Sequence, residues 1–200
     1  MVKQAIIPLA GLGTRLLPLT SVFAKELLPI NGKPGLEYIL DECIEAGIKE
    51  IIFIISKKKM MIKKYFYNDK FYKDIIKNKK DPRIISEYKK ILKYKTLGTG
   101  DAVFKTKKFI KNPYFLMLLP DDLIIKKNCS KSMIVAHNRY KSSVMATMSV
   151  PKKTISRWGI FDIQKKIDKN NFLINGVIEK PSLKNAPSNK AVIGRYILPK

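Results

Sequence analysis

Short apolar runs that alternate with a helix-like segment restrict the fold of this 200-residue chain more than any other feature. Residues 4–9 form one such run, and residues 50–55 form another that is too short and too rich in isoleucine for a helix. Between them, residues 34–46 have the apolar spacing of an amphipathic helix, and Gly47 follows as a stop signal. Strands that are apolar throughout are typical of a parallel sheet covered on both faces. We therefore expect the chain to begin with a βαβ unit.

The same alternation continues through most of the chain. We expect further strands at residues 83–88, 114–119 and 143–150, and helices at residues 56–80, 98–110 and 132–140. After Pro151 the pattern changes to short strands and turns, at residues 158–163, 172–179 and 191–198. The sequence thus predicts an α/β fold: a Rossmann-like, mixed but mostly parallel sheet with helices on both faces and a β-rich C-terminal elaboration. Ligands of such folds bind at the carboxyl ends of the strands.

No repeat and no linker-like stretch divides the sequence, so we expect residues 1–200 to form a single domain. The chain ends directly after a predicted strand, without a polar tail. We therefore expect that a further segment normally follows.

The formal net charge of +24 raises the question of a nucleic-acid partner. Of the 40 basic residues only five are arginine, the side chain that reads bases and grips phosphates with two parallel hydrogen bonds. The lysines are spread over the chain and no nucleic-acid reader motif is present. We interpret the charge as compositional drift on the surface and keep nucleic-acid binding as the weaker alternative.

The cysteine and apolar patterns indicate the compartment. Cys43 and Cys129 lie far apart and neither belongs to a CxxC pair, so a disulfide framework or a zinc site is not supported. The N-terminus lacks a signal-peptide pattern, and no run approaches the roughly 18 to 20 apolar residues that cross a bilayer. We expect a cytoplasmic protein without a membrane partner.

Residues 9–30, LAGLGTRLLPLTSVFAKELLPI, carry the strongest chemical signal. Gly11 and Gly13 allow the backbone to approach an oligophosphate and to direct N–H groups at its oxygens, and Arg15 and Lys25 add cations. The Lys-Ser/Thr of a Walker A loop and the third glycine of GxGxxG are both missing. The glycines alone are also compatible with a tight strand-to-helix turn that carries two surface cations.

The whole string resembles the signature of sugar-1-phosphate nucleotidylyltransferases, in which a GxGTR turn is followed by Pro18 and by Lys25 leading into ELLPI. Five further motifs follow in the family's order: LGTGDAV at 97–103, LLPDDLI at 118–124, WGI at 158–160, VIEKP at 177–181 and VIGRY at 192–196. The resemblance implies that the phosphate of a sugar 1-phosphate attacks the α-phosphorus of a nucleoside triphosphate and expels pyrophosphate. Within the family the motifs are most similar to members that use UTP and glucose 1-phosphate with Mg²⁺ and form UDP-glucose.

The resemblance also implies a role for individual residues. The catalytic cations would be Arg15 for the departing pyrophosphate, Lys25 for the reacting phosphates and Lys180 for the attacking phosphate. The nucleotide would lie against Ala10, Gly11, Leu12, Gly13, Thr14, Glu26, Lys93 and Gly98. Asp121 would hold Mg²⁺, a hard ion that takes carboxylate and phosphate oxygens. The sugar would contact Asp122, Gly159, Glu179 and Gly194. Because neighbouring residues of a strand point to opposite faces, Glu179 and Lys180 can serve one site only if the chain turns there.

The sequence departs from the family at several positions. Lys93 stands where the family usually has a glutamine that reads uracil, and lysine has no acceptor for that readout. Asp101 replaces a common histidine and Ala24 a common proline. Family members also usually continue beyond this length, with a second metal-binding aspartate and oligomer contacts, so a homo-oligomer is expected where that segment is present. Two alternatives therefore stay open: a sister enzyme with another base or sugar, and an inactive, C-terminally truncated fragment that binds nucleotide.

Overall fold

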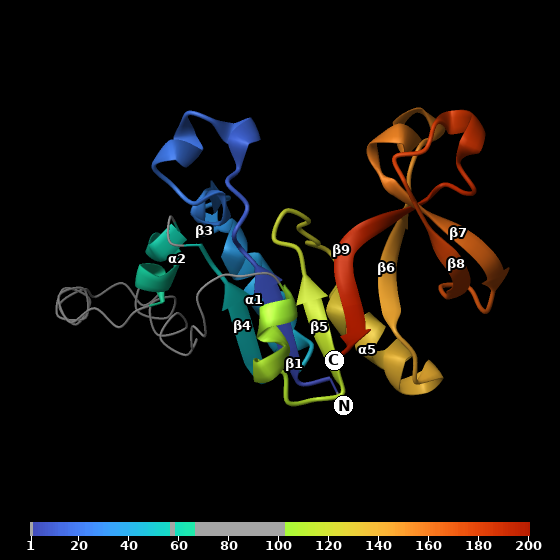
Figure 1. Ribbon diagram of the computed structural model, residues 1–200, viewed down its shortest axis with the longest axis horizontal. Coiled ribbons are helices and arrows are strands. Elements are labelled where there is room, and N and C mark those ends of the chain that lie inside the picture. The colour runs from blue at the N-terminus through green and yellow to red at the C-terminus, as the bar shows by residue number, and fades with distance from the viewer. Residues whose placement is uncertain (1, 57–58, 67–102) are drawn as a thin grey trace.

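The computed structural model describes residues 2–56, 59–66 and 103–200 (Figure 1). Its main sheet has the strand order β4-β1-β5-β9-β7-β8, and β6 pairs with β9. The strands of this sheet are β1 (Gln4–Pro8), β4 (Glu50–Ile54), β5 (Tyr114–Leu118), β6 (Val144–Ser149), β7 (Gly159–Lys166), β8 (Phe172–Glu179) and β9 (Lys190–Pro199). The α-helices are α1 (Gly35–Glu45), α2 (Met60–Tyr65) and α5 (Cys129–Tyr140). Short 3-10 helices lie at Thr14–Leu16, Leu19–Ser21, Lys25–Leu27, Val103–Phe109, Lys152–Arg157 and Leu183–Asn185, and β2 (Pro29–Ile30) pairs with β3 (Lys33–Pro34).

The sheet is mixed, as predicted, and most of its strands share one direction. Strand β1 lies between β4 and β5 and pairs with both in parallel, so that Ile6 faces Ile52 on one side and Met117 on the other. Strand β9 is antiparallel to β5, β6 and β7, and β8 is antiparallel to β7. Strands β4, β1, β5, β6 and β7 therefore run one way, and only β9 and β8 run the other way. The β-rich C-terminal elaboration is the β7–β8 hairpin together with the upper part of the long, curved β9 (Figure 1).

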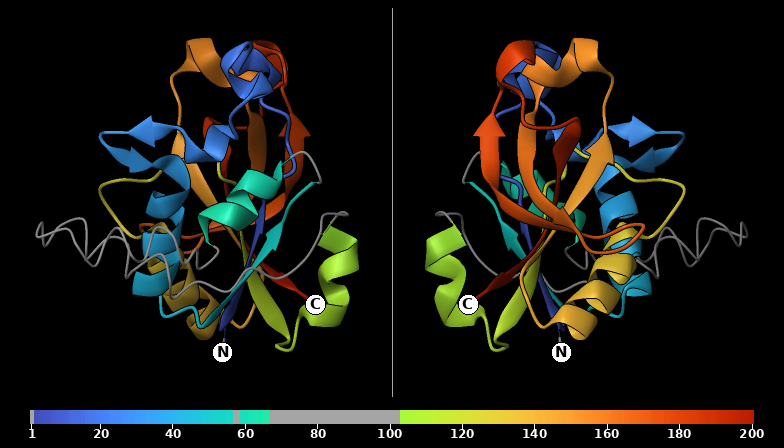
Figure 2. Two further views of the ribbon diagram at one scale, coloured as in Figure 1. Left: turned by 90° about the vertical axis from the view of Figure 1, so that its left-hand side faces the viewer. Right: turned by 90° about the vertical axis from the view of Figure 1, so that its right-hand side faces the viewer.

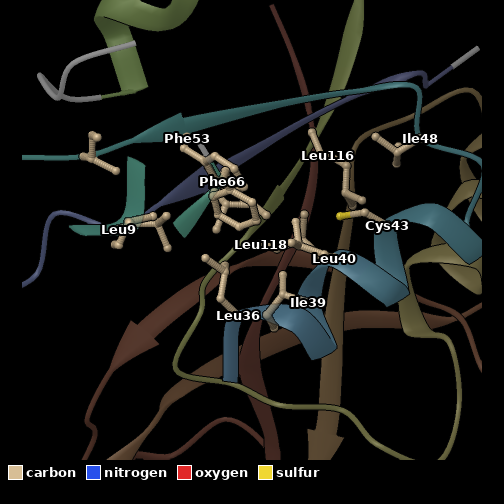
Figure 3. Close-up of a cluster of buried hydrophobic side chains, with 14 of the residues drawn as sticks. Leu9, Leu36, Ile39, Leu40, Cys43, Ile48, Phe53, Phe66, Leu116 and Leu118 are labelled. Carbon is tan, nitrogen blue, oxygen red and sulfur yellow. The ribbon is translucent and has the colours of Figure 1, made fainter. Parts of the chain in front are cut away.

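Helices cover both faces of the sheet (Figure 2). On one face, α1, α2 and α5 pack against alternate residues of β1, among them Ala5 and Ile7. Ile6 points to the opposite face, where it clusters with Ile52 and with Ile110, the residue after the 3-10 helix Val103–Phe109. The larger cluster is closed by apolar residues that α1 presents to the strands, and Figure 3 shows Leu36, Ile39, Leu40 and Cys43.

Sequence signals set the ends of the helices. Helix α1 follows Pro34, and Gly47 just beyond its end has φ 80°, a left-handed conformation that favours glycine. Helix α5 begins after Asn128, whose side chain accepts a hydrogen bond from the N–H of Lys131 at 2.8 Å. The predicted helix 34–46 is thus confirmed, and the predicted helix 132–140 begins three residues earlier, at Cys129.

Some expected elements lie outside the described residues. These are the strand at 83–88, most of the helix at 56–80 and the first part of the helix at 98–110. Within the described part of the last segment, Val103–Phe109 is a 3-10 helix. No helix among residues 2–56, 59–66 and 103–200 is long and apolar enough to span a membrane.

Candidate active site at the carboxyl ends of β1 and β5

The loop after β1 has the backbone conformation that its glycines predict. Gly13 has φ 69°, and a Cβ at this position would lie 3.1 Å from Thr20 Cγ2 and 3.2 Å from Lys25 Cδ. The Thr20 hydroxyl donates a hydrogen bond to the Gly13 carbonyl at 2.8 Å, which closes the loop on itself. The left-handed conformation therefore favours glycine at position 13, and a larger residue would also crowd Thr20 and Lys25. Ala10, Gly11 and Leu12 are exposed just before it.

This loop and the segment after β5 enclose a cavity of about 430 Å³. Its walls include Gly13, Thr14, Arg15, Lys25, Glu26 and Asp121. The structure thus brings together the predicted cations of the N-terminal segment and the predicted metal ligand, which are far apart in the sequence. A cavity with two cations at the start of a glycine loop suits a polyanion such as a triphosphate.

Lys25 and Asp121 form an ion pair inside this cavity. The side chain of Lys25 is 19% exposed and that of Asp121 is 63% exposed, so the carboxylate can be reached from the cavity. Among the described residues, no group of three or more His, Cys, Asp and Glu side chains is placed to hold a metal. Mg²⁺ is commonly bound by one or two carboxylates together with substrate phosphates, so an exposed carboxylate beside a phosphate-sized cavity fits this ion.

Glu26 lines the cavity, but its carboxylate is buried. The ammonium group of Lys59 donates to Glu26 Oε1 at 2.7 Å and to Oε2 at 2.8 Å, and both side chains are almost fully buried. Glu26 was expected to contact the nucleoside, and the structure places both of its oxygens against Lys59. The sequence analysis missed Lys59, because a lysine in a KKKMMIKK run has the pattern of a solvated helix.

A second cavity of about 400 Å³ lies on the other side of the segment after β5. It is lined by all four residues expected on the sugar side: Asp122, Gly159, Glu179 and Gly194. The N–H of Gly194 donates to Asp122 Oδ2 at 2.6 Å and holds this carboxylate against β9. The four positions come from four segments, the turn after β5 and strands β7, β8 and β9, which the fold brings to one place.

Two aromatic residues of this cavity, Trp158 and Tyr196, were not predicted as site residues. Burial, and then the nearby carboxylates of Asp122 and Glu179, raise the pKa of Tyr196 above its ordinary value. The phenol therefore stays protonated at neutral pH and can donate a hydrogen bond to a ligand. Trp158 belongs to the WGI motif and Tyr196 to the VIGRY motif, so membership of these motifs could have identified both as site residues.

The chain turns directly after Glu179, as the shared use of Glu179 and Lys180 requires. Lys180 has φ 45°, and its backbone N–H donates to the Trp158 carbonyl at 3.0 Å. Its ammonium group lies 3.6 Å from Glu179 Oε1, so the two charged ends are on the same side of the turn. Glu179 lines the cavity, whereas Lys180 pairs with Glu179 without lining either cavity.

Lys93 and Gly98 lie outside the described residues. His137 on α5, the single histidine of the chain, packs against Tyr114 at the start of β5, at the opposite end of this strand from Asp121. Its Nδ1 lies 2.7 Å from the Ser142 carbonyl.

The chain is similar in sequence and in fold to known proteins. A family model described as "Nucleotidyl transferase" matches residues 4–200. A UTP–glucose-1-phosphate uridylyltransferase from Streptococcus pyogenes is 36% identical over 211 residues, which cover 98% of this chain and 69% of the relative. The solved structure of a UTP-bound UGPase from Acinetobacter baumannii has a TM-score of 0.87 at 29% identity and covers 100% of this chain and 75% of that chain. A UDP-glucose pyrophosphorylase solved with UDP-glucose has a TM-score of 0.85 at 28% identity, over 100% and 76% of the two chains.

Proposed function

The chain belongs to the nucleotidyl transferase family, and from this premise we propose that it forms UDP-glucose and pyrophosphate from UTP and glucose 1-phosphate. The relative from Streptococcus pyogenes is named for this reaction, and the solved structures hold UTP in one case and UDP-glucose in the other. The reaction joins two anions, so catalysis depends on positioning and on neutralising charge.

The observation that supports the proposal most is the position of two consecutive carboxylates. Asp121 lines the cavity of the glycine loop, and Asp122 lines the cavity with Glu179 and Gly194. A triphosphate in the first cavity and a glucosyl group in the second would meet at this segment. The sugar phosphate would then lie beside the α-phosphorus that it attacks.

Each group has a task that its chemistry suits. Arg15 would neutralise the departing pyrophosphate, Lys25 the reacting phosphates and Lys180 the attacking phosphate. Glu179 and Asp122 would accept hydrogen bonds from sugar hydroxyls, and the absence of a side chain at Gly159 leaves room beside Glu179 Oε2. Asp121 would hold Mg²⁺, which when bound neutralises charge on the phosphate oxygens.

The test is a pyrophosphate-release assay with UTP, glucose 1-phosphate and MgCl₂. We expect release by the wild-type chain, loss of release in Asp121→Ala, and little change in Asp162→Ala, which removes a partly exposed carboxylate of β7 that lines neither cavity. Faster release with dTTP than with UTP would support the sister enzyme that Lys93 leaves open. Nucleotide binding without pyrophosphate release from any triphosphate would contradict the proposal and support the binding-fragment alternative.

A further inference from the structure

Arg195 on β9 is the one arginine of this chain whose guanidinium is fully buried among the described residues. It donates to the Glu42 carboxylate on α1, from Nε at 3.0 Å and from Nη2 at 2.8 Å. The same group also donates from Nη1 to the Leu119 carbonyl at 3.1 Å and from Nη2 to the Asp122 carbonyl at 2.8 Å. Leu119 and Asp122 flank Pro120 and Asp121, so one side chain holds both ends of the turn that separates the two cavities.

Glu42 is itself held in place. Its Oε1 accepts a hydrogen bond from the N–H of Ser130 at 3.0 Å and another from the Ser130 hydroxyl at 2.6 Å. Arg195 therefore reaches the turn from a fixed anchor, made by α1 and the first turn of α5. A pair of buried charges contributes little net stability, because the loss of hydration offsets the attraction between the charges. What the planar guanidinium adds is direction, since it can contact two carbonyls and a carboxylate at once.

We propose that Arg195 is a positioning residue of the nucleotidyl transfer reaction. It fixes the turn so that the Asp121 carboxylate faces the triphosphate cavity while Asp122 faces the sugar cavity. The Gly194 N–H on Asp122 Oδ2 comes from the neighbouring residue of β9 and fixes the Asp122 side chain in the same frame. This inference rests on the proposed function, because it assigns Arg195 a task in that reaction.

Two variants separate positioning from mere stability. Arg195→Lys keeps a positive charge against Glu42, but a point-like ammonium cannot reach Glu42 and both carbonyls together. The double variant Glu42→Met/Arg195→Met replaces the ion pair by apolar groups, a change that is often neutral or stabilising when both charges are removed. Ser130→Ala is the matched control, since it weakens the hold on Glu42 from the α5 side without touching the turn.

The experiment measures thermal melting, kcat, the KM for glucose 1-phosphate and the Mg²⁺ concentration for half-maximal rate. It also measures Mn²⁺ binding in the presence of UTP by electron paramagnetic resonance. Misplacing reacting groups by about 1 Å costs about 100-fold in rate. We therefore expect both Arg195 variants to lose about 10- to 100-fold in kcat, to need more Mg²⁺ and to bind Mn²⁺ more weakly, at temperatures where they are fully folded. Ser130→Ala should melt earlier but keep the wild-type kcat and metal dependence.

The outcomes distinguish this inference from the proposed function. Folded Arg195 variants with wild-type kcat, metal dependence and Mn²⁺ binding, beside an active wild type, would overturn the role of Arg195 alone. A wild type that binds UTP but releases no pyrophosphate would overturn the proposed function and, with it, the role of Arg195. Parallel losses in Ser130→Ala and Arg195→Lys would show that Arg195 acts only through stability and would also overturn the inference.

Discussion

Substitution of Gly194 by alanine is a sharp test of the sugar-side cavity. A methyl group at this position would lie 2.5 Å from Leu119 Cβ, 2.9 Å from Leu119 Cγ and 2.8 Å from Asp122 Oδ2. The contact with Leu119 Cβ cannot be relieved by rotating a side chain, because Cβ is fixed by the backbone. The backbone of β9 must therefore move away from the turn after β5, or the turn must move away from β9.

The size of the effect follows from these contacts. Overpacking a well-packed site costs about 1–3 kcal/mol. A displaced Asp122 carboxylate also loses the 2.6 Å hydrogen bond from the Gly194 N–H, and a hydrogen bond to a charged group is worth about 1.5–3 kcal/mol. We expect a loss of about 3 kcal/mol in the free energy of unfolding. For a chain of this size that corresponds to a fall in Tm of roughly 6–12 °C.

The measurement is thermal melting together with the KM for glucose 1-phosphate, with Gly176→Ala as the control. A Cβ at Gly176, on β8, would have no atom within 4 Å, so this variant should melt like the wild type or slightly above it. Below its melting temperature Gly194→Ala should have a raised KM for glucose 1-phosphate and a nearly unchanged KM for UTP. Equal melting temperatures in the two variants would refute the close approach of β9 to the turn.

Three further predictions concern charged groups. Lys59→Met leaves the Glu26 carboxylate buried and unpaired, so it should lower the free energy of unfolding by about 3–5 kcal/mol. Denaturant titrations measure this loss, and Lys63→Met, on the exposed side of α2, should not show it. The pKa of Asp168 is held well below its usual range, first by the Asn170 N–H and then by the side chains of Asn171 and Tyr140, so its stabilising effect is full at neutral pH and is lost as the pH falls below about 4. Asp168→Asn should therefore melt below the wild type at pH 7, and the difference in Tm should narrow progressively as the pH is lowered from about 4 toward 2. Lys25→Met removes the ion-pair partner of Asp121, so the variant protein should bind Mn²⁺ up to about fivefold more tightly than the wild type in the absence of nucleotide. Unchanged or weaker Mn²⁺ binding would contradict the pairing of Lys25 with Asp121.

The parts of the fold that could be predicted are those in which local pattern and tertiary environment agree. Strand β1 has no exposed position, and residues 4–9 have no polar alternation to suggest otherwise. Helix α1 has both an apolar stripe and a glycine after its end. Whether β9 runs parallel or antiparallel to its neighbours could not be predicted, because an apolar run of residues is compatible with both kinds of pairing.

Prediction of the site residues has a different limit: motifs suggest which residues serve one ligand, but not which distant residues meet in the folded chain. Motif resemblance placed Asp122 and Gly194 on the same ligand, and the structure joins them by a hydrogen bond although 72 positions separate them. Arg195 stands next to Gly194 in the same motif, yet a charged residue in a strand is usually exposed, and nothing nearby in the sequence indicates its burial. Its partner Glu42 is 153 positions away, so only the folded chain reveals the pair.

Lys59 and Arg195 are buried cations whose partners or neighbours in the chain line the two cavities. Two buried ion pairs are seen in the described part of the chain, Lys59–Glu26 and Arg195–Glu42. Each contains a residue next in sequence to one that lines a cavity: Glu26 follows Lys25, and Arg195 follows Gly194. In each couple one residue lines a cavity, and the charged group of its neighbour is buried against an ion-pair partner. A buried charge without its partner would be costly, so each ion pair restrains the backbone beside a cavity residue. The lysine excess, which the sequence analysis interpreted as surface drift, therefore includes Lys59, a cation that is buried against Glu26 beside a cavity residue.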